Sequence, residues 1–511
     1  MFRTNEKVRE KWQHRFNVFL VDEFQDVDHV QYEIIDLMVS DKNELYVVGD
    51  PDQTIYSWRG ANMDFIVDFN RHYSDATTIT LHRNYRSTQN ILDSANRLIE
   101  FNPGRVEKRL LSHKDVGDPI VLTNLDDEHD EAYWVVRQMR KLHDEGVSFL
   151  DMAVLYRSNY LSRVLEKVMM DMGIPYIIYG GIRFYDRMEI KDMMSYLRMV
   201  SHGDDLALRR SIAAPKRGIG PKTLEKYFEH AQAHDMTIYE AMKEEVDKGQ
   251  STTRIKDYVS LIESFKTHYE KHESIEKLMI EILESSGLRQ LYEKDEEIER
   301  MENVKALMGE AKEFQENTME DLPAYVQMVS LYGDRDEVLE GEFVRLMTIH
   351  GAKGLEFDTV FLIGMNDGIF PNRNAVIESK DGLTEERRLA YVAITRAMHR
   401  LFVSSNAGFN YVLSQRNKPS RFMREMDHES TVHDVGGIIQ ENSPQDMAFK
   451  QYKKKDKLRI KPADVVVHDD FGEGIVLSLD EDKVKVAFNY PFGTKIIMRD
   501  FAGLRLKGDL T

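Results

Sequence analysis

The sequence predicts an α/β protein, and three observations support this class. Short apolar runs rich in β-formers end in polar residues at 16–22 and 44–50, as buried strands of a parallel sheet do. Longer amphipathic stretches, 28–39 and 87–101, alternate with such runs, so strands and helices succeed one another. The chain has 511 residues, of which 42% are hydrophobic and 31% charged. This composition excludes wholesale disorder, and the length indicates about three to four domains.

The remaining elements follow in order along the chain. A third strand is expected at 77–81, and a second set begins at 149–158 and resumes at 344–364, which indicates a second sheet. Between these two parts of the second set, the hydrophobic pattern is helical. The chain ends in short alternating strands with glycine-rich turns. The expected domains are a partial first α/β domain at 1–83, a second α/β domain at 84–186 and 344–430, a helical insertion at 187–343, a linker at 431–462 and a small β-barrel at 463–511.

Charge and composition limit the classes of function. The net charge is −19, but the segment 271–340 alone carries 8 basic and 19 acidic residues, so the average does not exclude a basic groove elsewhere. The absence of cysteine excludes disulfides, thiol catalysis and cysteine-ligated metals. No apolar run reaches 18 residues and no signal-like leader follows Met1, so we expect a soluble, cytoplasmic protein without membrane contact.

Two carboxylates, Asp22 and Glu23, directly follow the first expected strand. Open α/β sheets bind their ligands at the carboxyl ends of their strands. In a nucleotide hydrolase, Asp22 would hold Mg²⁺ here, and Glu23 would orient and deprotonate the attacking water. The alternative is a helix N-cap with exposed acids, and the pair alone does not distinguish the two.

Gln53, Tyr56 and Trp58 follow the second expected strand. A glutamine at this place can touch a terminal phosphate. The two aromatic residues can offer flat faces to unstacked bases, and such stacking contributes about 1–3 kcal/mol per base. The alternative is an aromatic pair in the core, which the polar and small neighbours of Trp58 make less favourable.

Three later segments carry further candidates. Tyr85 suits stacking on a nucleobase, and Arg86 has the fork of donors that a phosphate needs. His350 stands in a turn whose backbone amides can contact a phosphodiester. Arg396 lies near the end of a predicted helix, and an arginine supplied across a domain cleft can raise phosphoryl transfer by about 10³–10⁵. Surface ion pairing is the alternative for each arginine.

The chain as a whole resembles the UvrD/PcrA/Rep family of superfamily 1 DNA helicases. The resemblance covers nearly the whole chain and rests on six segments in order: DEFQD, VVGDPDQTIYSWRGA, LHRNYRS, YGGIRFYDRMEIKD, LMTIHGAKGLEFDTVFL and EERRLAYVAITRA. It implies two RecA-like motor domains, the first incomplete, that use ATP and Mg²⁺ and move 3′ to 5′ along one strand. Single-stranded DNA and junctions of single- and double-stranded DNA are the implied substrates, in repair or replication.

The same resemblance implies a role for each motif residue. The implied roles are magnesium and water activation for Asp22 and Glu23, contact with the γ-phosphate for Gln53, Arg86 and Arg396, stacking on adenine for Tyr85, proximity to the ribose for Glu356, and single-stranded DNA binding for Tyr56, Trp58 and His350.

The helical insertion and the C-terminal strands also have counterparts in the family. Gly218 and Gly220, with Lys216, Arg217 and Lys222 beside them, resemble a hairpin that touches the backbone of duplex DNA. Two glycines let amides approach phosphates, and the basic residues supply charge. An ordinary corner between two helices is the alternative. The C-terminal barrel resembles a Tudor-like module that binds RNA polymerase.

One family motif has no counterpart in the sequence. Walker A, G-x-x-x-x-G-K-[ST], cradles the phosphates, but neither Gly-Lys-Ser nor Gly-Lys-Thr occurs here. We therefore expect a helicase fragment that is inactive alone and whose first sheet exposes an edge. The alternative is a non-hydrolysing module that binds DNA or RNA polymerase. A helicase–nuclease subunit is less favoured, because the tail lacks a nuclease-like cluster of carboxylates with a lysine.

Overall fold

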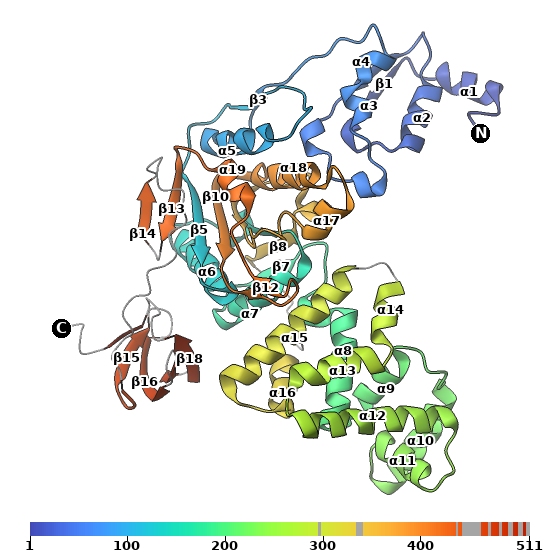
Figure 1. Cartoon of the computed structure of the whole chain (residues 1–511). Coiled ribbons are helices and arrows are strands. Elements are labelled where there is room, and N and C mark those ends of the chain that lie inside the picture. The colour runs from blue at the N-terminus through green and yellow to red at the C-terminus, as the bar shows by residue number, and fades with distance from the viewer. Residues whose placement is uncertain are drawn as a thin grey trace. The chain divides into compact units, whose positions relative to one another are not determined.

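The computed structural model describes nine stretches of the chain, which form two compact units (Figure 1). Unit 1 comprises Met1–Gln315, Glu320–Asp434 and Gln440–Asn442, and unit 2 comprises the other residues. None of the helices in the described part is long and apolar enough to cross a membrane. The described residues are 1–294, 298–333, 341–435, 438–441, 461–468, 472–479, 483–488, 494–498 and 504–506.

Unit 1 begins with a small parallel sheet of two strands. Strands β1 (Val18–Val21) and β2 (Glu44–Val47) pair in parallel, with α1 (Glu6–Gln13) before them and α2 (His29–Met38) between them. Helix α2 begins at a capping box, in which Asp28 and Gln31 satisfy backbone amides that the first turn leaves free. The strands expected at 16–22 and 44–50 are thus confirmed.

The prediction of a strand at 77–81 is wrong. These residues form no regular element, and Ile79 and Leu81 expose 78% and 74% of their surface. A β-prone run becomes a strand only where a neighbour supplies hydrogen bonds and cover. The nearby pairing instead joins β3 (Arg83–Asn84) to β4 (Leu111–Ser112), just after the expected run.

The main sheet of unit 1 has eight strands in the order β14-β13-β5-β10-β9-β6-β8-β7. The six neighbouring pairs from β13 to β7 are parallel, and β6 is buried along its whole length, as a central parallel strand is. The strand bounds are β5 (Ile120–Leu125), β6 (Met152–Tyr156), β7 (Tyr176–Ile178), β8 (Val344–Thr348), β9 (Phe357–Leu362), β10 (Ala397–Asn406), β13 (Thr431–Val435) and β14 (Ile438–Glu441).

Helices cover both faces of the main sheet (Figure 1). One core packs α5 (Gln89–Glu100), α18 (Gly382–Ile394) and α19 (Arg421–Met426) against it, and a second core packs α6 (Glu128–Asp144) and α7 (Ser162–Asp171). A largely parallel sheet with helices on both faces is an α/β fold, so the predicted class is confirmed. Residues 431–435, expected in the linker, instead form β13, which pairs with β5.

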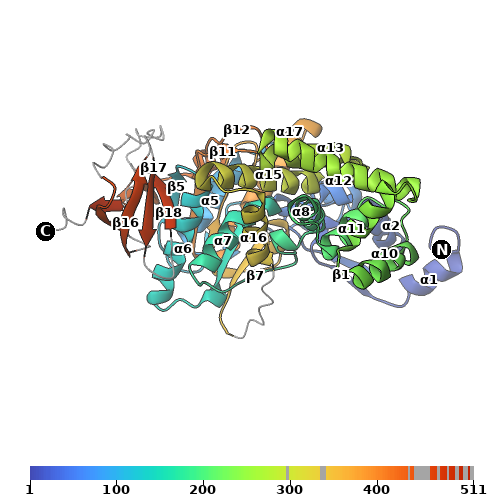
Figure 2. The same cartoon turned by 90° about the horizontal axis from the view of Figure 1, so that it is seen from below.

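The chain between the adjacent strands β7 and β8 contains only helices among its described elements. Helix α8 lies among the helices of this part, which include α12, α13 and α16 (Figure 2). It packs against these three and α9, and its Tyr196 meets Phe265 of α12 at 6.1 Å between ring centroids. The bounds are α8 (Met188–Ser201), α9 (Asp205–Ala213), α10 (Pro221–His234), α11 (Ile238–Asp247), α12 (Thr253–His272), α13 (Ile275–Ser285), α14 (Leu288–Lys294), α15 (Ile298–Thr318) and α16 (Leu322–Gly333).

Unit 2 contains an antiparallel sheet in the order β18-β17-β16-β15-β19. Its core consists of Val466, Val476, Val484, Val486 and Phe488. The described pairings place β18 and β19 at the two ends of this order, so closure into a barrel stays a prediction. The bounds are β15 (Val465–His468), β16 (Gly472–Leu479), β17 (Lys483–Phe488), β18 (Thr494–Met498) and β19 (Leu504–Leu506). Most of the expected linker lies outside the described residues.

Candidate nucleotide and DNA site

The loop after β1 presents two carboxylates to solvent. Asp22 Oδ1 accepts a hydrogen bond from the backbone amide of Glu23 at 2.9 Å. Glu23 has a φ of 51° in the left-handed region, which a residue other than glycine adopts only when its surroundings hold it there. The Glu23 carboxylate accepts a hydrogen bond from Gln25 Nε2 at 2.6 Å, while its side chain stays 60% exposed. The Glu23 carboxylate is therefore accessible but oriented.

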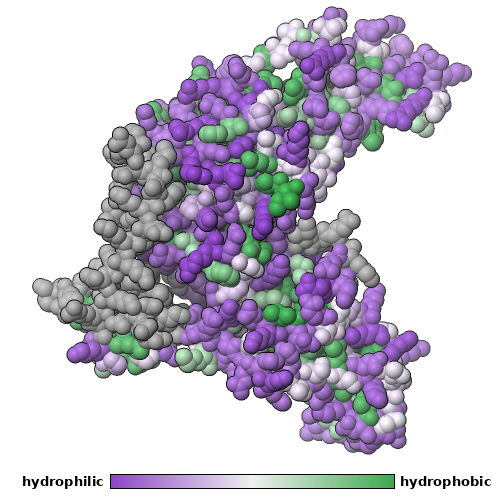
Figure 3. Space-filling model, viewed as in Figure 1, coloured by the Kyte–Doolittle hydropathy of each residue, from purple (hydrophilic) through white to green (hydrophobic). Residues whose placement is uncertain are grey.

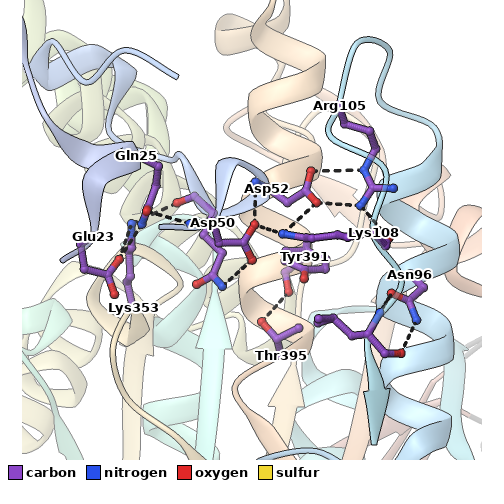
Figure 4. Close-up of polar contacts among 12 residues, drawn as sticks. Glu23, Gln25, Asp50, Asp52, Asn96, Arg105, Lys108, Lys353, Tyr391 and Thr395 are labelled. Atoms are coloured by element: carbon purple, nitrogen blue, oxygen red, sulfur yellow. Dashed lines mark hydrogen bonds and ion pairs between the residues drawn. The ribbon is translucent and has the colours of Figure 1, made fainter. Parts of the chain in front are cut away.

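The turn after β2 contains a network of charges, in which Asp50 and Asp52 meet Arg105 and Lys108 (Figure 4). Gln53 Nε2 donates to Asp50 Oδ2 at 2.9 Å, and Asp50 forms an ion pair with Lys108. Lys108 also lies 3.2 Å from Asp52, which Arg105 contacts at 2.7 Å. Two cations thus neutralise two acids, and the Gln53 side chain is anchored at the end of β2.

Lys353 connects the loops after β1 and β2 with the segment between β8 and β9. Its Nζ donates to the carbonyl of Gln53 at 3.0 Å, lies 3.7 Å from Glu23 Oε2 and forms an ion pair with Asp26. Burial raises the pKa of Asp26, and Lys353 opposes this shift. Because the Lys353 side chain is only 8% exposed, its charge acts mainly on these partners.

Two arginines come from the segments after β3 and α18. Arg86 Nε donates to Glu356 Oε2 at 2.6 Å, and Arg86 also contacts the carbonyl of Thr395 at 3.3 Å. Arg396 is 2% exposed, and burial lowers its pKa to about 10, with a further lowering by the charge of Arg86. The charges of Glu23 and Glu356 act on Arg396 in the opposite direction. The charges of Glu23, Glu356 and Arg86 therefore all influence the Arg396 guanidinium.

Tyr85 stands apart from these groups in the described contacts. It is 65% exposed, and its ring centroid lies 5.0 Å from that of His113. None of the described hydrogen bonds, ion pairs or ring contacts joins Tyr85 to Glu23 or Arg396. That these three residues line one nucleotide pocket stays a prediction.

The predicted DNA-facing residues do lie together. The Tyr56 ring centroid is 6.5 Å from that of Trp58 and 6.3 Å from that of His350, and the Tyr56 hydroxyl donates to the His350 carbonyl at 3.2 Å. Trp58 is 66% exposed, and the Arg59 guanidinium lies 4.5 Å from its ring centroid. Burial lowers the pKa of His350 to about 3, so its imidazole is neutral at physiological pH.

Trp58 and His350 line a cavity of about 720 Å³. Glu302 of α15 also lines it, and burial raises the pKa of this carboxyl to about 7. The face of the molecule seen in Figure 3 is mostly hydrophilic, with separate hydrophobic areas. The cavity thus combines an exposed indole with polar and ionisable groups.

The turn before α10 contains the two predicted glycines. Gly218 has a φ of 70°, its carbonyl accepts from Arg254 at 2.9 Å, and Gly220 is the N-cap of α10. Lys216 and Lys222 are exposed beside them. Arg217, expected to supply charge here, instead donates inward to the hydroxyl of Tyr196 at 2.7 Å and to the carbonyl of Ser286 at 2.9 Å.

Sequence reasoning did not assign several residues of this region. Gln25 and Asp26 belong to the DEFQD segment and Lys353 to a turn that the sequence singled out, but the contacts of Gln25 with Asp50 and of Asp26 with Lys353 depend on the meeting of distant loops. The signals available in the sequence were an amide and an acid within DEFQD and a lysine between two small residues. The network formed by Asp50, Asp52, Arg105 and Lys108 had no such signal.

Comparison with known proteins identifies the family. Residues 79–408 match the UvrD-like helicase C-terminal domain, and residues 1–74 match the UvrD/REP helicase N-terminal domain. The chain is 36% identical to "ATP-dependent DNA helicase PcrA" of Staphylococcus epidermidis, over 98% of this chain and 72% of that protein. It is 35% identical to the protein of the same name from Staphylococcus aureus, over 100% of this chain and 73% of that protein.

A solved structure described as the C-terminal domain of a possible DNA helicase from Lactobacillus plantarum covers 68% of this chain and 98% of its own. Its sequence identity is 12% and its TM-score is 0.28, so the family assignment rests on the sequence matches alone. These matches span nearly the whole chain, and they agree with the acidic, arginine-bearing and aromatic motifs described above. The chain belongs to the UvrD/PcrA-like helicase family.

Proposed function

We propose that this protein supplies motor parts of an ATP-dependent DNA helicase that moves 3′ to 5′ along single-stranded DNA in repair or replication. The observation that carries the proposal is the position of Lys353, whose Nζ lies 3.7 Å from Glu23 Oε2 and donates to the carbonyl of Gln53 at 3.0 Å, so that the two loops bearing the proposed catalytic groups meet at one cation. Phosphoryl transfer is catalysed chiefly by such placed charges, because the protein must position the phosphates and neutralise the charge that develops on them.

The residues present fit a magnesium nucleotide. Asp22 is an exposed carboxylate at the end of β1, and Mg²⁺ prefers oxygen ligands of this kind while keeping several waters. Bound ATP with Mg²⁺ would supply the phosphoanhydride and neutralise part of its charge. Tyr85 would stack on the adenine, and Glu356 would lie near the ribose.

The other residues would act on the reaction itself. Glu23 would orient a water and accept its proton, and Gln53 would contact the terminal phosphate from the end of β2. Arg86 and Arg396 would donate to the oxygens of the transferred phosphate. The ion pair of Lys353 with Asp26 would link these groups to the segment that carries His350.

Single-stranded DNA would bind at Tyr56, Trp58 and His350. Trp58 offers an exposed face for a base, and the neutral His350 imidazole offers a hydrogen bond in place of a charge. Gly218, Gly220, Lys216 and Lys222 would contact the backbone of duplex DNA at a junction.

The phosphate cradle decides whether the 511-residue polypeptide is active by itself. Because these residues contain no Gly-Lys-Ser or Gly-Lys-Thr, we infer that the polypeptide alone does not hydrolyse ATP. A preceding segment with a Walker A loop would restore hydrolysis. The missing cradle also motivates the second candidate function, a non-hydrolysing module that binds DNA through Trp58 or RNA polymerase through the unit 2 sheet.

The test compares this polypeptide with a version extended by a Walker A segment from a family member. Phosphate release is measured with and without poly(dT), and unwinding is measured on duplexes with 3′ or 5′ tails. We expect DNA-stimulated turnover only in the extended protein, a loss of at least about a hundredfold in Glu23→Gln, and unwinding from 3′ tails.

Two results would contradict parts of this proposal. Turnover by the unextended polypeptide that Glu23→Gln abolishes would show that the cradle is not required. An extended protein that binds DNA but hydrolyses no ATP would favour the binding module. Pull-down of purified RNA polymerase by the unextended polypeptide tests the remaining partner.

A further inference from the structure

The carboxamide of Gln25 lies between the two loops that carry the proposed catalytic groups. Gln25 is 1% exposed, and both ends of its amide are used. Its Nε2 donates to Glu23 Oε2 at 2.6 Å, while its Oε1 accepts from the backbone amide of Asp50 at 2.9 Å (Figure 4). One buried side chain therefore ties the Glu23 carboxylate to the end of β2.

Gly49 has no side chain, and this leaves space for the Gln25 carboxamide. A Cβ atom built on Gly49 would lie 2.5 Å from Gln25 Oε1 and 2.8 Å from Ile66 Cδ1. The first distance is far below van der Waals contact, so any side chain at position 49 would displace the carboxamide or the strand end. Glycine at position 49 and glutamine at position 25 thus depend on each other.

Among the described residues, Gln25 is the one side chain that donates a hydrogen bond to the Glu23 carboxylate. Lys353 Nζ approaches the same oxygen only to 3.7 Å, which is an ion pair without a hydrogen bond. Glu23 is otherwise exposed and has a left-handed backbone, so its rotamer depends on this single directional contact.

We propose that Gln25 is a positioning residue that aims the Glu23 carboxylate at the attacking water, and that Gly49 makes this possible by leaving space for the Gln25 amide. The inference rests on the proposed function, because it needs Glu23 as the base. A base displaced by about 1 Å can lose about a hundredfold in rate, although the substrate still binds. Removing the Gln25 amide should therefore lower kcat and leave KM unchanged.

The kinetic test uses the protein extended by a Walker A segment. Gln25→Met keeps the length and burial of the side chain but removes both hydrogen bonds, and Gln31→Met is the matched control because Gln31 only completes the capping box of α2. We expect Gln25→Met to lower kcat about tenfold to hundredfold with KM for ATP within twofold, and Gln31→Met to leave both constants unchanged. Gly49→Ala should reproduce the kcat loss of Gln25→Met.

A second pair of variants distinguishes a lost orientation of the Glu23 carboxylate from a general disturbance of the protein. In Glu23→Asp the shortened carboxylate withdraws from Gln25, so Gln25→Met should have little further effect in that background. The proposal would be overturned if Gln25→Met lowered kcat by the same factor in the Glu23→Asp background as in the wild type. So would a rise in KM with kcat unchanged, because that pattern indicates lost substrate binding.

The dependence of Gly49 on Gln25 can be tested without catalysis in the 511-residue polypeptide. Urea unfolding of Gly49→Ala, Gln25→Ala and the double variant forms a cycle. We expect Gly49→Ala to lower the unfolding midpoint less in the Gln25→Ala background, since the clash with Oε1 is gone. Additive midpoint shifts would overturn the proposed spatial dependence.

The failure of this inference can be told apart from the failure of the proposed function. If the extended wild type hydrolyses no ATP, both the proposed function and the positioning role of Gln25 are contradicted. If the extended wild type is active and Gln25→Met has an unchanged kcat, only the positioning role is contradicted.

Discussion

The hydroxyl of Tyr56 donates a hydrogen bond to the carbonyl of His350 across 3.2 Å, although 294 positions separate the two residues. This contact joins the aromatic segment after β2 to the segment after β8. Tyr56 lies beside Trp58, and His350 lines the same cavity as Trp58. The proposed DNA-binding surface is therefore assembled from two distant parts of the chain.

Replacing the two aromatic residues should have different effects on DNA binding. Trp58→Ala removes an exposed stacking face and should weaken binding of labelled oligo(dT) by about 1–3 kcal/mol, roughly fivefold to hundredfold. Tyr56→Phe keeps the ring and loses the hydrogen bond, so the unfolding free energy should fall by about 0.5–1.5 kcal/mol with little change in affinity. Fluorescence anisotropy measures the first effect and urea unfolding the second. Equal affinities of wild type and Trp58→Ala would contradict the stacking role.

The cavity should make binding of single-stranded DNA depend on pH. The pKa of Glu302 is raised to about 7 by burial, so this carboxyl is mostly neutral at pH 6 and ionised at pH 8. Its negative charge repels phosphates, and affinity for oligo(dT) should fall by about twofold to tenfold from pH 6 to pH 8. His350, with a pKa of about 3, does not titrate in this range.

Glu302→Gln should flatten this pH profile, whereas Glu378→Gln, which removes an exposed carboxylate lining the same cavity but keeps Glu302, should leave the profile steep. The raised pKa also affects stability. The Glu302 contribution to the unfolding free energy is fully present below about pH 4.5 and is lost as pH rises through 7. A profile that stays steep in Glu302→Gln would exclude this carboxyl as its cause.

Lys353→Ala should destabilise the protein more at high pH than at low pH. It leaves Asp26, whose Oδ1 already has no hydrogen-bond partner, without its cation. We expect a loss of about 2 kcal/mol at pH 8, below the roughly 3–5 kcal/mol of fully buried pairs because the site is partly exposed. Burial raises the pKa of Asp26, so this carboxyl is neutralised at a higher pH than a free aspartate, and the loss should shrink as the pH falls. Asp26→Asn should rescue part of the loss in urea unfolding at pH 8.

Lys216 and Lys222 should contribute to duplex binding through charge. Replacing both with alanine should lower affinity for a hairpin duplex uniformly across sequences and reduce the slope of log K against log salt by about two. Lys226→Ala is the control, because Lys226 also lies on α10 but pairs with Glu245 at 2.7 Å. An unchanged salt slope in the double variant would remove these lysines from the proposed contact.

Local patterns predicted much of the fold. The apolar runs at 16–22 and 44–50 became β1 and β2, and the helical pattern between β7 and β8 became helices, because each pattern matches a single period of the backbone. The run at 77–81 has the same composition as a strand but no partner to pair with, and it stayed irregular. The pairing of residues 431–435 with β5 likewise depends on a strand some 300 positions away, which no local pattern reveals.

Part of the candidate site could likewise be predicted from the sequence, and part could not. The sequence alone placed Asp22, Glu23 and Gln53 at the ends of strands and indicated arginines for a phosphate, because residue type and position in a motif determine which chemistry is available. Only the tertiary structure decided that Lys353 pairs with Asp26, that Gln25 accepts a hydrogen bond from Asp50 and that Arg217 turns inward. Such contacts depend on burial and on which distant side chains meet, and neither is encoded in the spacing of a single segment.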